Sequence, residues 1–234
     1  MTAAGSVRGT PHEIALLAGG PRAAVTVAVV ALHLRGAVEA GAPGTILIAD
    51  EGAGQDLPPL PQAGLPLDTP ADSVEGQAPT ITGAVRASYL ESAVYHCLDE
   101  PSDIRELVRH PDVRWALAEV RVGLADAGML RYPLLRPNRA ARRRLKMLRK
   151  AHPLPPSRRG LPDHDKLIAI ALHGVPALRV LVPRFALRAG LTDRVKITEK
   201  NWPRHSPRGD TYGGNGGYFY CGSGGGGGGG GGSD

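Results

Sequence analysis

Apolar residues recur at helical spacing through most of the chain, and glycines and prolines divide this pattern into separate helices. A short helix is predicted over residues 11–18 and ends at Gly19-Gly20, because glycine readily takes the left-handed conformation found at helix C-termini. Pro21 then begins a second helix, since the first helical position needs no backbone donor. This alanine- and valine-rich helix is predicted to run to about Arg35.

In a second block, prolines and a glycine again mark the starts and the end of the predicted helices. Leu90–Leu98 has apolar residues at helical spacing, and Pro101-Ser102-Asp103 begins a further helix. Pro111-Asp112 begins the last helix of the block, which is predicted to end before Gly128. Three helices in a row with short connections indicate an α-helical module.

The two blocks end alike. In each, a helix begun by proline is followed by a glycine, Gly36 or Gly128, and then by apolar residues. The third helix of a winged-helix unit leads into its first wing strand in this way, so the pattern favours a weak internal duplication of winged-helix-like modules. Thr45–Ala49 is the predicted β-type run.

A strongly basic helix is predicted over residues 138–151. Ala141, Leu145 and Leu148 form a narrow apolar stripe on it, and three prolines after residue 152 end it. The most apolar stretch of the second half follows and predicts helices over 165–174 and 176–189.

Two segments are unsuited to a folded core. Residues 51–80 hold six prolines among Gly, Asp and Gln, which indicates a linker or an overlong loop. The nine glycines of Gly224–Gly232 follow an already Gly-rich stretch, and glycine loses the most entropy on ordering and has no side chain to bury. A disordered Gly-rich tail is therefore predicted.

The predicted fold is mainly α, as one compact unit or two closely packed winged-helix-like modules with minor β structure. Aromatic residues make up only 4% of the chain, so a core of Ala, Val and Leu favours packed helices over a β-sandwich. The predicted boundaries are a first module at 1–50, an acidic Pro/Gly-rich linker at 51–80, a second module at 81–135, the basic helix with its Pro-rich end at 136–160, a C-terminal helical segment at 161–200 and the tail at 201–234.

Charge is concentrated in two places. The net charge is +6, and residues 131–160 carry eleven Lys and Arg but no acid, whereas residues 51–80 carry five acids and no base. Cys97 and Cys221 are too few for a disulfide framework, which fits a reducing cytoplasm. No secretory signal or full-length apolar span is evident, so we expect no transmembrane helix and a cytoplasmic protein, with a peripheral position at the inner face of the membrane as an alternative.

The order of several of these motifs along the chain can be compared with that of known domain families. Leu17-Ala18-Gly19-Gly20-Pro21-Arg22 precedes the alanine- and valine-rich helix, and Ala93-Val94-Tyr95 leads into the second block, which closes with Ala127-Gly128-Met129-Leu130. The arginine-rich helix and the Gly-rich end complete the order over nearly the whole chain. In this order the chain resembles an uncharacterised domain family found mainly in actinobacteria.

That resemblance implies an N-terminal helical domain with a Gly/Cys-rich C-terminal tail, and it implies no particular reaction. Many members are described as membrane proteins, whereas this chain lacks an uninterrupted apolar span. Members also intersperse cysteines through the Gly-rich end, and only Cys221 stands there in this chain. A shared cysteine-based role is therefore not carried over.

The basic helix is the main candidate for a binding site. Its clustered cations suit nucleic-acid phosphates, or an anionic protein or membrane surface with Leu145 and Leu148 inserted, and the alternative is a solvated helix packed by its stripe onto the second block. Few aromatic side chains accompany it for base stacking. The candidate contacts are Arg139, Arg142, Arg143, Arg144, Lys146, Arg149 and Lys150.

The sequence gives less support to a metal site or a catalytic site. Residues 162–165 with His152 and His173 offer metal-ligand atoms, but acids at a helix start are ordinary N-caps, so we expect no metal and no cofactor. His96 and Cys97 point about 100° apart on a helix, so they are not a nucleophile–base pair, and Cys97 is expected to be a small buried apolar residue. His33, on the apolar helix, is expected to be a module-edge or a satisfied core histidine. No acid, base and nucleophile converge, so an enzyme is the least favoured class.

The tail offers a second contact, the aromatic cluster and thiol of Tyr218, Phe219, Tyr220 and Cys221. The leading hypothesis is a non-enzymatic interaction or scaffold protein that uses the cationic helix and the flexible tail to meet an unknown protein partner. The alternatives are a winged-helix-like nucleic-acid binder, read through Pro111–Leu124 or Pro21–Arg35, and a peripheral membrane protein.

Overall fold

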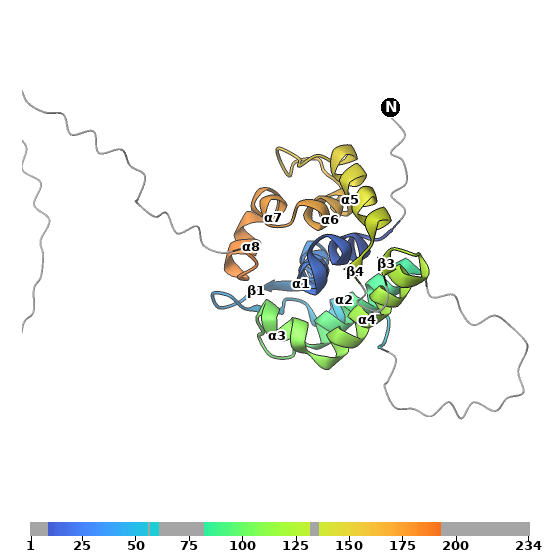
Figure 1. The fold of residues 1–234 in the computed structure, drawn as a ribbon. Helices are drawn as coiled ribbons and strands as arrows, with labels where there is room; N and C mark the ends of the chain where they lie inside the picture. Colours follow the sequence, from blue (N-terminus) through green and yellow to red (C-terminus); the bar gives the residue numbers. More distant parts are fainter. Residues whose placement is uncertain (1–8, 56, 61–81, 132–135, 193–234) are drawn as a thin grey trace, which may run out of the picture. The chain divides into compact units, whose positions relative to one another are not determined.

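The computed structural model describes residues 9–55, 57–60, 82–131 and 136–192. These residues are 64% helical and 7% strand, which confirms the prediction of a mainly α fold with minor β structure. They all belong to a compact unit that spans residues 1–195 (Figure 1). The predicted tail lies outside the described residues.

The first helix, α1 (Pro11–Leu34), lies at the centre of the unit (Figure 1). Its start is fixed by a capping box, in which Thr10 Oγ1 accepts from the Glu13 N–H at 3.3 Å and Glu13 Oε2 accepts from the Thr10 N–H at 2.9 Å. Gly20 has a φ of 76°, and Pro21 follows it. The predicted break is therefore a sharp kink between two helical halves of α1.

Two short antiparallel hairpins confirm that the two blocks end alike. After α1 the chain passes Gly36, with a φ of 81°, into β1 (Val38–Ala40), which pairs with β2 (Ile46–Ile48). After α4 (Pro111–Asp126) it passes Gly128, with a φ of 64°, into β3 (Leu130–Arg131), which pairs with β4 (Arg136–Pro137). The comparison with winged-helix modules stays a prediction.

The second block contains three helices, as predicted. They are α2 (Gly83–His96), α3 (Ile104–Arg109) and α4. Asp103 caps α3 through the N–H groups of Arg105 and Glu106, at 2.6 and 2.8 Å. Ser102, just before α3, forms an isolated antiparallel bridge with Ile46 of β2, so the two blocks are joined through their backbones. A 3₁₀ turn (Glu51–Gly54) follows β2.

The C-terminal part consists of α5 (Arg139–Ala151), α6 (Asp163–His173), α7 (Val175–Leu181) and α8 (Pro183–Arg188). The segment predicted as one helix over 176–189 is two helices, because Val182 leaves the helical conformation immediately before Pro183. The Gly44 N–H donates to the Arg188 carbonyl at 2.7 Å and ties α8 to the first hairpin.

One hydrophobic core joins residues from all the predicted segments that the structure describes. Helix α1 packs against α2, α3 and α4 on one side and along α6 on the other. Val25, Val29 and Leu32 of α1 are at most 1% exposed. The described parts of the two predicted modules therefore belong to the same hydrophobic core.

Helix α1 also bears on the question of a membrane span. By length and composition it is long and apolar enough to cross a membrane, and it is the one such helix among the described residues. In this structure 56% of its most apolar 18-residue window is buried against protein. The core helix of a soluble protein has the same properties. The expectation that the chain has no transmembrane helix stays a prediction.

Candidate functional site

Helix α5 presents its cations as one continuous face. Arg139, Arg143, Lys146 and Lys150 follow one another at three- and four-residue spacing, so they lie along one ridge of the helix, and all four are exposed. At 1.5 Å per residue the ridge is about 16 Å long. The flanking cations are the exposed Arg142 and Arg149 and the half-buried Arg144.

The opposite face of α5 anchors it to the core. Ala141 and Leu145 are buried, Leu148 is half-buried, and the Arg149 Nε donates to the Leu172 carbonyl at 3.0 Å. The main packing partners are α1 and α6, not the second block as the sequence suggested. Because Leu145 and Leu148 face protein, they are not available for insertion into a membrane in this structure.

The start of α5 is held by Asn138. Its Oδ1 accepts from the Ala141 N–H at 2.9 Å, and its Nδ2 donates to the Gly128 carbonyl at 2.6 Å. The first bond caps the helix, and the second joins the cap to the glycine that ends α4. The cationic face therefore has a fixed position relative to the second block.

The cations of α5 have no carboxylate within ion-pair distance among the described residues. No acid occurs from residue 131 to residue 160, and none of the ion pairs between described side chains includes a cation of α5. Like charges also stand four residues apart at 139 and 143, 142 and 146, and 146 and 150. Each such pair destabilises a helix by roughly 0.2–0.5 kcal/mol. An anionic surface laid along this face would relieve the repulsion.

The helices suggested for reading DNA are less suitable. The second half of α1 is buried among other helices, so the idea that Pro21–Arg35 enters a groove is wrong for this structure. Helix α4 has an accessible face, but the helix carries only two cations, Arg114 and Arg121, whereas α5 carries seven. So few positive charges do not favour a polyanion.

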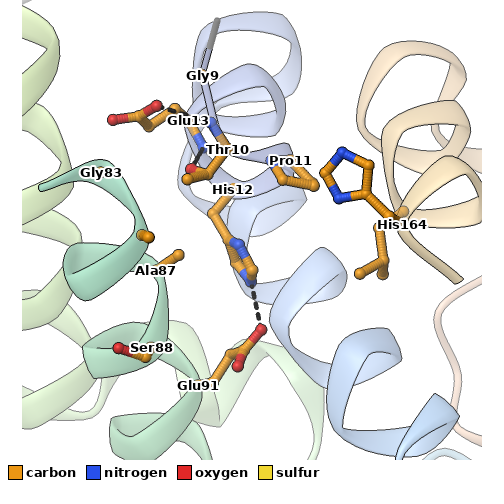
Figure 2. A pocket seen from close by; sticks show the side chains of 12 residues that line it. Gly9, Thr10, Pro11, His12, Glu13, Gly83, Ala87, Ser88, Glu91 and His164 are labelled. Atoms are coloured by element: carbon orange, nitrogen blue, oxygen red, sulfur yellow. Dashed lines mark hydrogen bonds and ion pairs between the residues drawn. The ribbon is translucent and has the colours of Figure 1, made fainter. Parts of the chain in front are cut away.

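A buried ionic cluster lies beside a pocket of about 640 Å³ between the start of α1, α2 and α6 (Figure 2). His12 is 3% exposed, and its Nε2 lies 3.2 Å from Glu91 Oε1, while Arg35 forms an ion pair with Glu91 Oε2. Burial alone would raise the pKa of the Glu91 carboxyl, but the His12 ring and the Arg35 guanidinium outweigh it and hold that pKa below 4.5. Glu91 thus stays ionised in a largely buried position.

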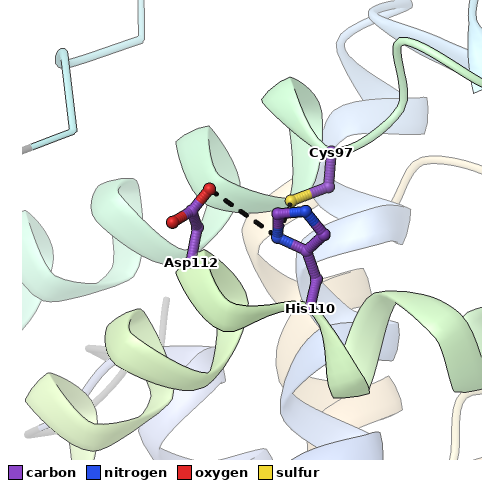
Figure 3. Close-up of side chains that lie close together, drawn as sticks. All are labelled: Cys97, His110 and Asp112. Atoms are coloured by element: carbon purple, nitrogen blue, oxygen red, sulfur yellow. Dashed lines mark hydrogen bonds and ion pairs between the residues drawn. The ribbon is translucent and has the colours of Figure 1, made fainter.

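A second cluster joins Cys97, His110 and Asp112 (Figure 3). Cys97 follows α2, His110 stands between α3 and α4, and Asp112 lies in the first turn of α4. The Cys97 Sγ is 2.8 Å from His110 Nδ1, and the same nitrogen is 3.6 Å from Asp112 Oδ2. Cys97 is half-buried and makes a polar contact, so describing it as a small apolar residue is incomplete.

The histidines singled out in the sequence have other roles. The His33 ring stacks on Phe185 with centroids 3.8 Å apart, and its Nδ1 lies 3.1 Å from the Val38 carbonyl oxygen, which fits the expected satisfied histidine. His173 Nε2 lies 2.8 Å from the His152 carbonyl oxygen, and Asp163 pairs with Lys166 at 2.8 Å. These side chains do not form a metal-ligand group in the described part of the chain.

The tail residues Tyr218, Phe219, Tyr220 and Cys221 lie outside the described residues, so their predicted contact rests on the sequence. Comparison of the chain with protein-family models, curated proteins and solved structures gives no match.

Proposed function

We propose that this protein is a non-enzymatic interaction module that binds an anionic partner surface through the cationic face of α5. The observation that carries this proposal is a row of exposed cations, held by a packed opposite face and by the Asn138 cap, with no acid paired to it among the described residues. Such a face costs helix stability in isolation and gains it on contact with negative charge.

An acidic protein surface is the partner class that the chemistry favours. Met147 is 72% exposed beside the cations, and a flexible apolar side chain there suits a protein contact better than a phosphate backbone. The aromatic side chains that stack on nucleic-acid bases are missing from α5. Lipid headgroups and nucleic acid are the alternative partners, and the binding test distinguishes them.

The tail is the second part of the proposal and rests on sequence alone. We propose that Tyr218, Phe219 and Tyr220 add aromatic contacts to the same partner. Membership of the actinobacterial domain family and a cytoplasmic location, with a peripheral membrane position as the alternative, are proposed on the same basis. Removal of residues 201–234 should weaken binding without removing its salt dependence.

The test measures binding of the full-length chain to four probes at about 50 mM salt. They are an acidic polyglutamate peptide, vesicles with phosphatidylserine, vesicles of phosphatidylcholine alone and random duplex DNA. The proposal predicts binding to at least the acidic peptide, no binding to neutral vesicles, and affinity that falls steeply as salt is raised. Binding to anionic vesicles or DNA alone would assign the face to lipid or nucleic acid, and binding to no anionic probe would overturn the proposal.

Matched triple variants separate the α5 face from net charge. Arg142, Arg143 and Lys146 are replaced by glutamine in one variant, and the exposed Arg105, Arg109 and Arg114 in the control. Each cation near an anionic surface contributes about 1 kcal/mol, so the α5 variant should lose about a hundredfold in affinity. An equal loss in the control would show that binding follows net charge instead of this face.

A further inference from the structure

The cluster of Cys97, His110 and Asp112 has the composition of a metal site. Sulfur, imidazole nitrogen and carboxylate oxygen, one from each residue, lie within 4.8 Å of one another (Figure 3). Cys97 follows the end of α2, and His110 and Asp112 lie at the start of α4, so the end of one helix and the start of another hold the three donors together.

A nucleophilic cysteine does not fit this geometry. In a Cys-His-Asp catalytic arrangement the thiol and the carboxylate approach different nitrogens of the imidazole, so that one activates the thiol while the other orients the ring. Here the Cys97 Sγ and Asp112 Oδ2 approach the same nitrogen, Nδ1.

The donor distances suit a four-coordinate cation. With metal–sulfur, metal–nitrogen and metal–oxygen bonds of about 2.3, 2.0 and 2.1 Å, tetrahedral geometry puts neighbouring donors roughly 3.3–3.6 Å apart. The Nδ1–Oδ2 distance of 3.6 Å already matches this separation, and the Sγ–Nδ1 distance of 2.8 Å must open by less than about 1 Å. The sulfur and the carboxylate oxygen, which lie within 4.8 Å of each other, must come to about 3.6 Å. Cys97 and His110 are half-buried and Asp112 is exposed, so the side chains have room for this shift.

Local charge also favours a cation. Asp112 belongs to the cluster and Asp99 stands two residues after Cys97, so a divalent ion would offset part of the negative charge of the two carboxylates and the Cys97 thiolate. Sulfur with nitrogen and oxygen is the donor set of borderline-soft Zn²⁺, not of Mg²⁺ or Ca²⁺, which take oxygen ligands.

We propose that Cys97, His110 and Asp112 form a three-ligand Zn²⁺ site whose fourth position is open to water. On binding, the Cys97 S–H bond breaks, the proton leaves to solvent, and the sulfur forms a bond to the metal without any change of oxidation state. The site joins the end of α2 to the start of α4. Because it is half-exposed, the bound metal exchanges with solution.

The test uses the full-length chain, freed of metal with a chelator and titrated with Co²⁺ and with Zn²⁺. Co²⁺ at this site should give a thiolate-to-cobalt charge-transfer band and the intense visible bands of four-coordinate cobalt, and Zn²⁺ should abolish both. One proton should be released per metal bound at pH 7. No charge-transfer band up to about 1 mM Co²⁺ would overturn the proposal.

Variants assign the ligands. Cys97→Ser should abolish the charge-transfer band, and Asp112→Asn, at an exposed position where the fold is retained, should lower Co²⁺ affinity at least tenfold. Cys221→Ser is the control for the other thiol and should leave the band unchanged. A band that persists in Cys97→Ser or disappears in Cys221→Ser would place the metal elsewhere and refute the assignment.

Discussion

Replacement of Glu91 by glutamine tests the buried ionic cluster most directly. The variant keeps the shape of the side chain and removes its charge. The Glu91 side chain is 12% exposed and lies against His12, whose side chain is 4% exposed, whereas Arg35 is 48% exposed. The loss of folding stability in Glu91→Gln should therefore come mainly from the buried contact with His12.

The magnitude follows from these exposures. A buried contact to a charged group contributes about 1.5–3 kcal/mol, and the half-exposed Arg35 pair adds no more than about 1 kcal/mol because water screens it. We expect Glu91→Gln to lower the free energy of unfolding by about 2–3 kcal/mol at pH 7. Urea denaturation followed by far-ultraviolet circular dichroism measures this difference.

The pH dependence gives an independent check. The pKa of Glu91 is lower in the folded protein than its ordinary value of 4.5, so the unfolded chain binds more protons between those two values. The Glu91 contribution is therefore fully present above about pH 4.5 and is lost as pH falls through the folded pKa. The stability difference between wild type and Glu91→Gln should shrink in that window.

Glu119→Gln is the matched control, because Glu119 is a half-buried helical glutamate that is in none of the ion pairs between described side chains. It should change stability by less than about 0.5 kcal/mol. The reasoning is refuted if the two variants are equally stable at pH 7, or if their difference does not depend on pH.

Two further changes test local geometry by urea denaturation. Asn138→Ala should cost about 1 kcal/mol because it removes the cap on Ala141, whereas Asn138→Ser retains a capping hydroxyl and should lose less; equal losses would count against the capping role. Gly190→Ala should cost about 1–2 kcal/mol for its φ of 66°, and more because the new Cβ would lie 3.0 Å from the Gly44 Cα. Gly160→Ala is the control, because Gly160 has a similar φ of 70° and a Cβ there would have no heavy atom within 4 Å. If Gly160→Ala lost as much stability as Gly190→Ala, the approach to Gly44 would not be the cause of the extra loss.

Much of the helical pattern could be predicted because its signals are local. The break at Gly20-Pro21, the helix starts at Pro111 and Asn138, and the glycines before both hairpins each depend on a few neighbouring residues. Capping, proline and left-handed glycine act within one or two turns, so the sequence carries them directly.

The packing partner of α5 could not be predicted in the same way. Its stripe of Ala141, Leu145 and Leu148 indicates that one face is buried, but it does not specify which surface covers it. The second block was expected, and α1 and α6 provide the contact. Which helices meet depends on the whole set of apolar faces, which no single stripe specifies.

Both polar clusters were also missed, for a related reason. Cys97 was compared with its neighbour His96, whereas its partner His110 stands thirteen positions away across α3. Glu91 meets Arg35 across 56 positions. A buried acid amid apolar residues on α2 was the available signal, since an ionised carboxylate in a core needs a cation nearby.

The central place of α1 has a consequence for synthesis of the chain. Helix α1 leaves the ribosome before the other described helices, but the helix that packs along it most extensively, α6, is encoded about 130 residues later. At about 5–20 residues per second, α1 waits on the order of ten seconds for this cover. During that interval it is a nascent apolar helix of membrane-spanning length, open to chaperones and to the targeting machinery. Slower translation of residues 35–162 would lengthen the interval.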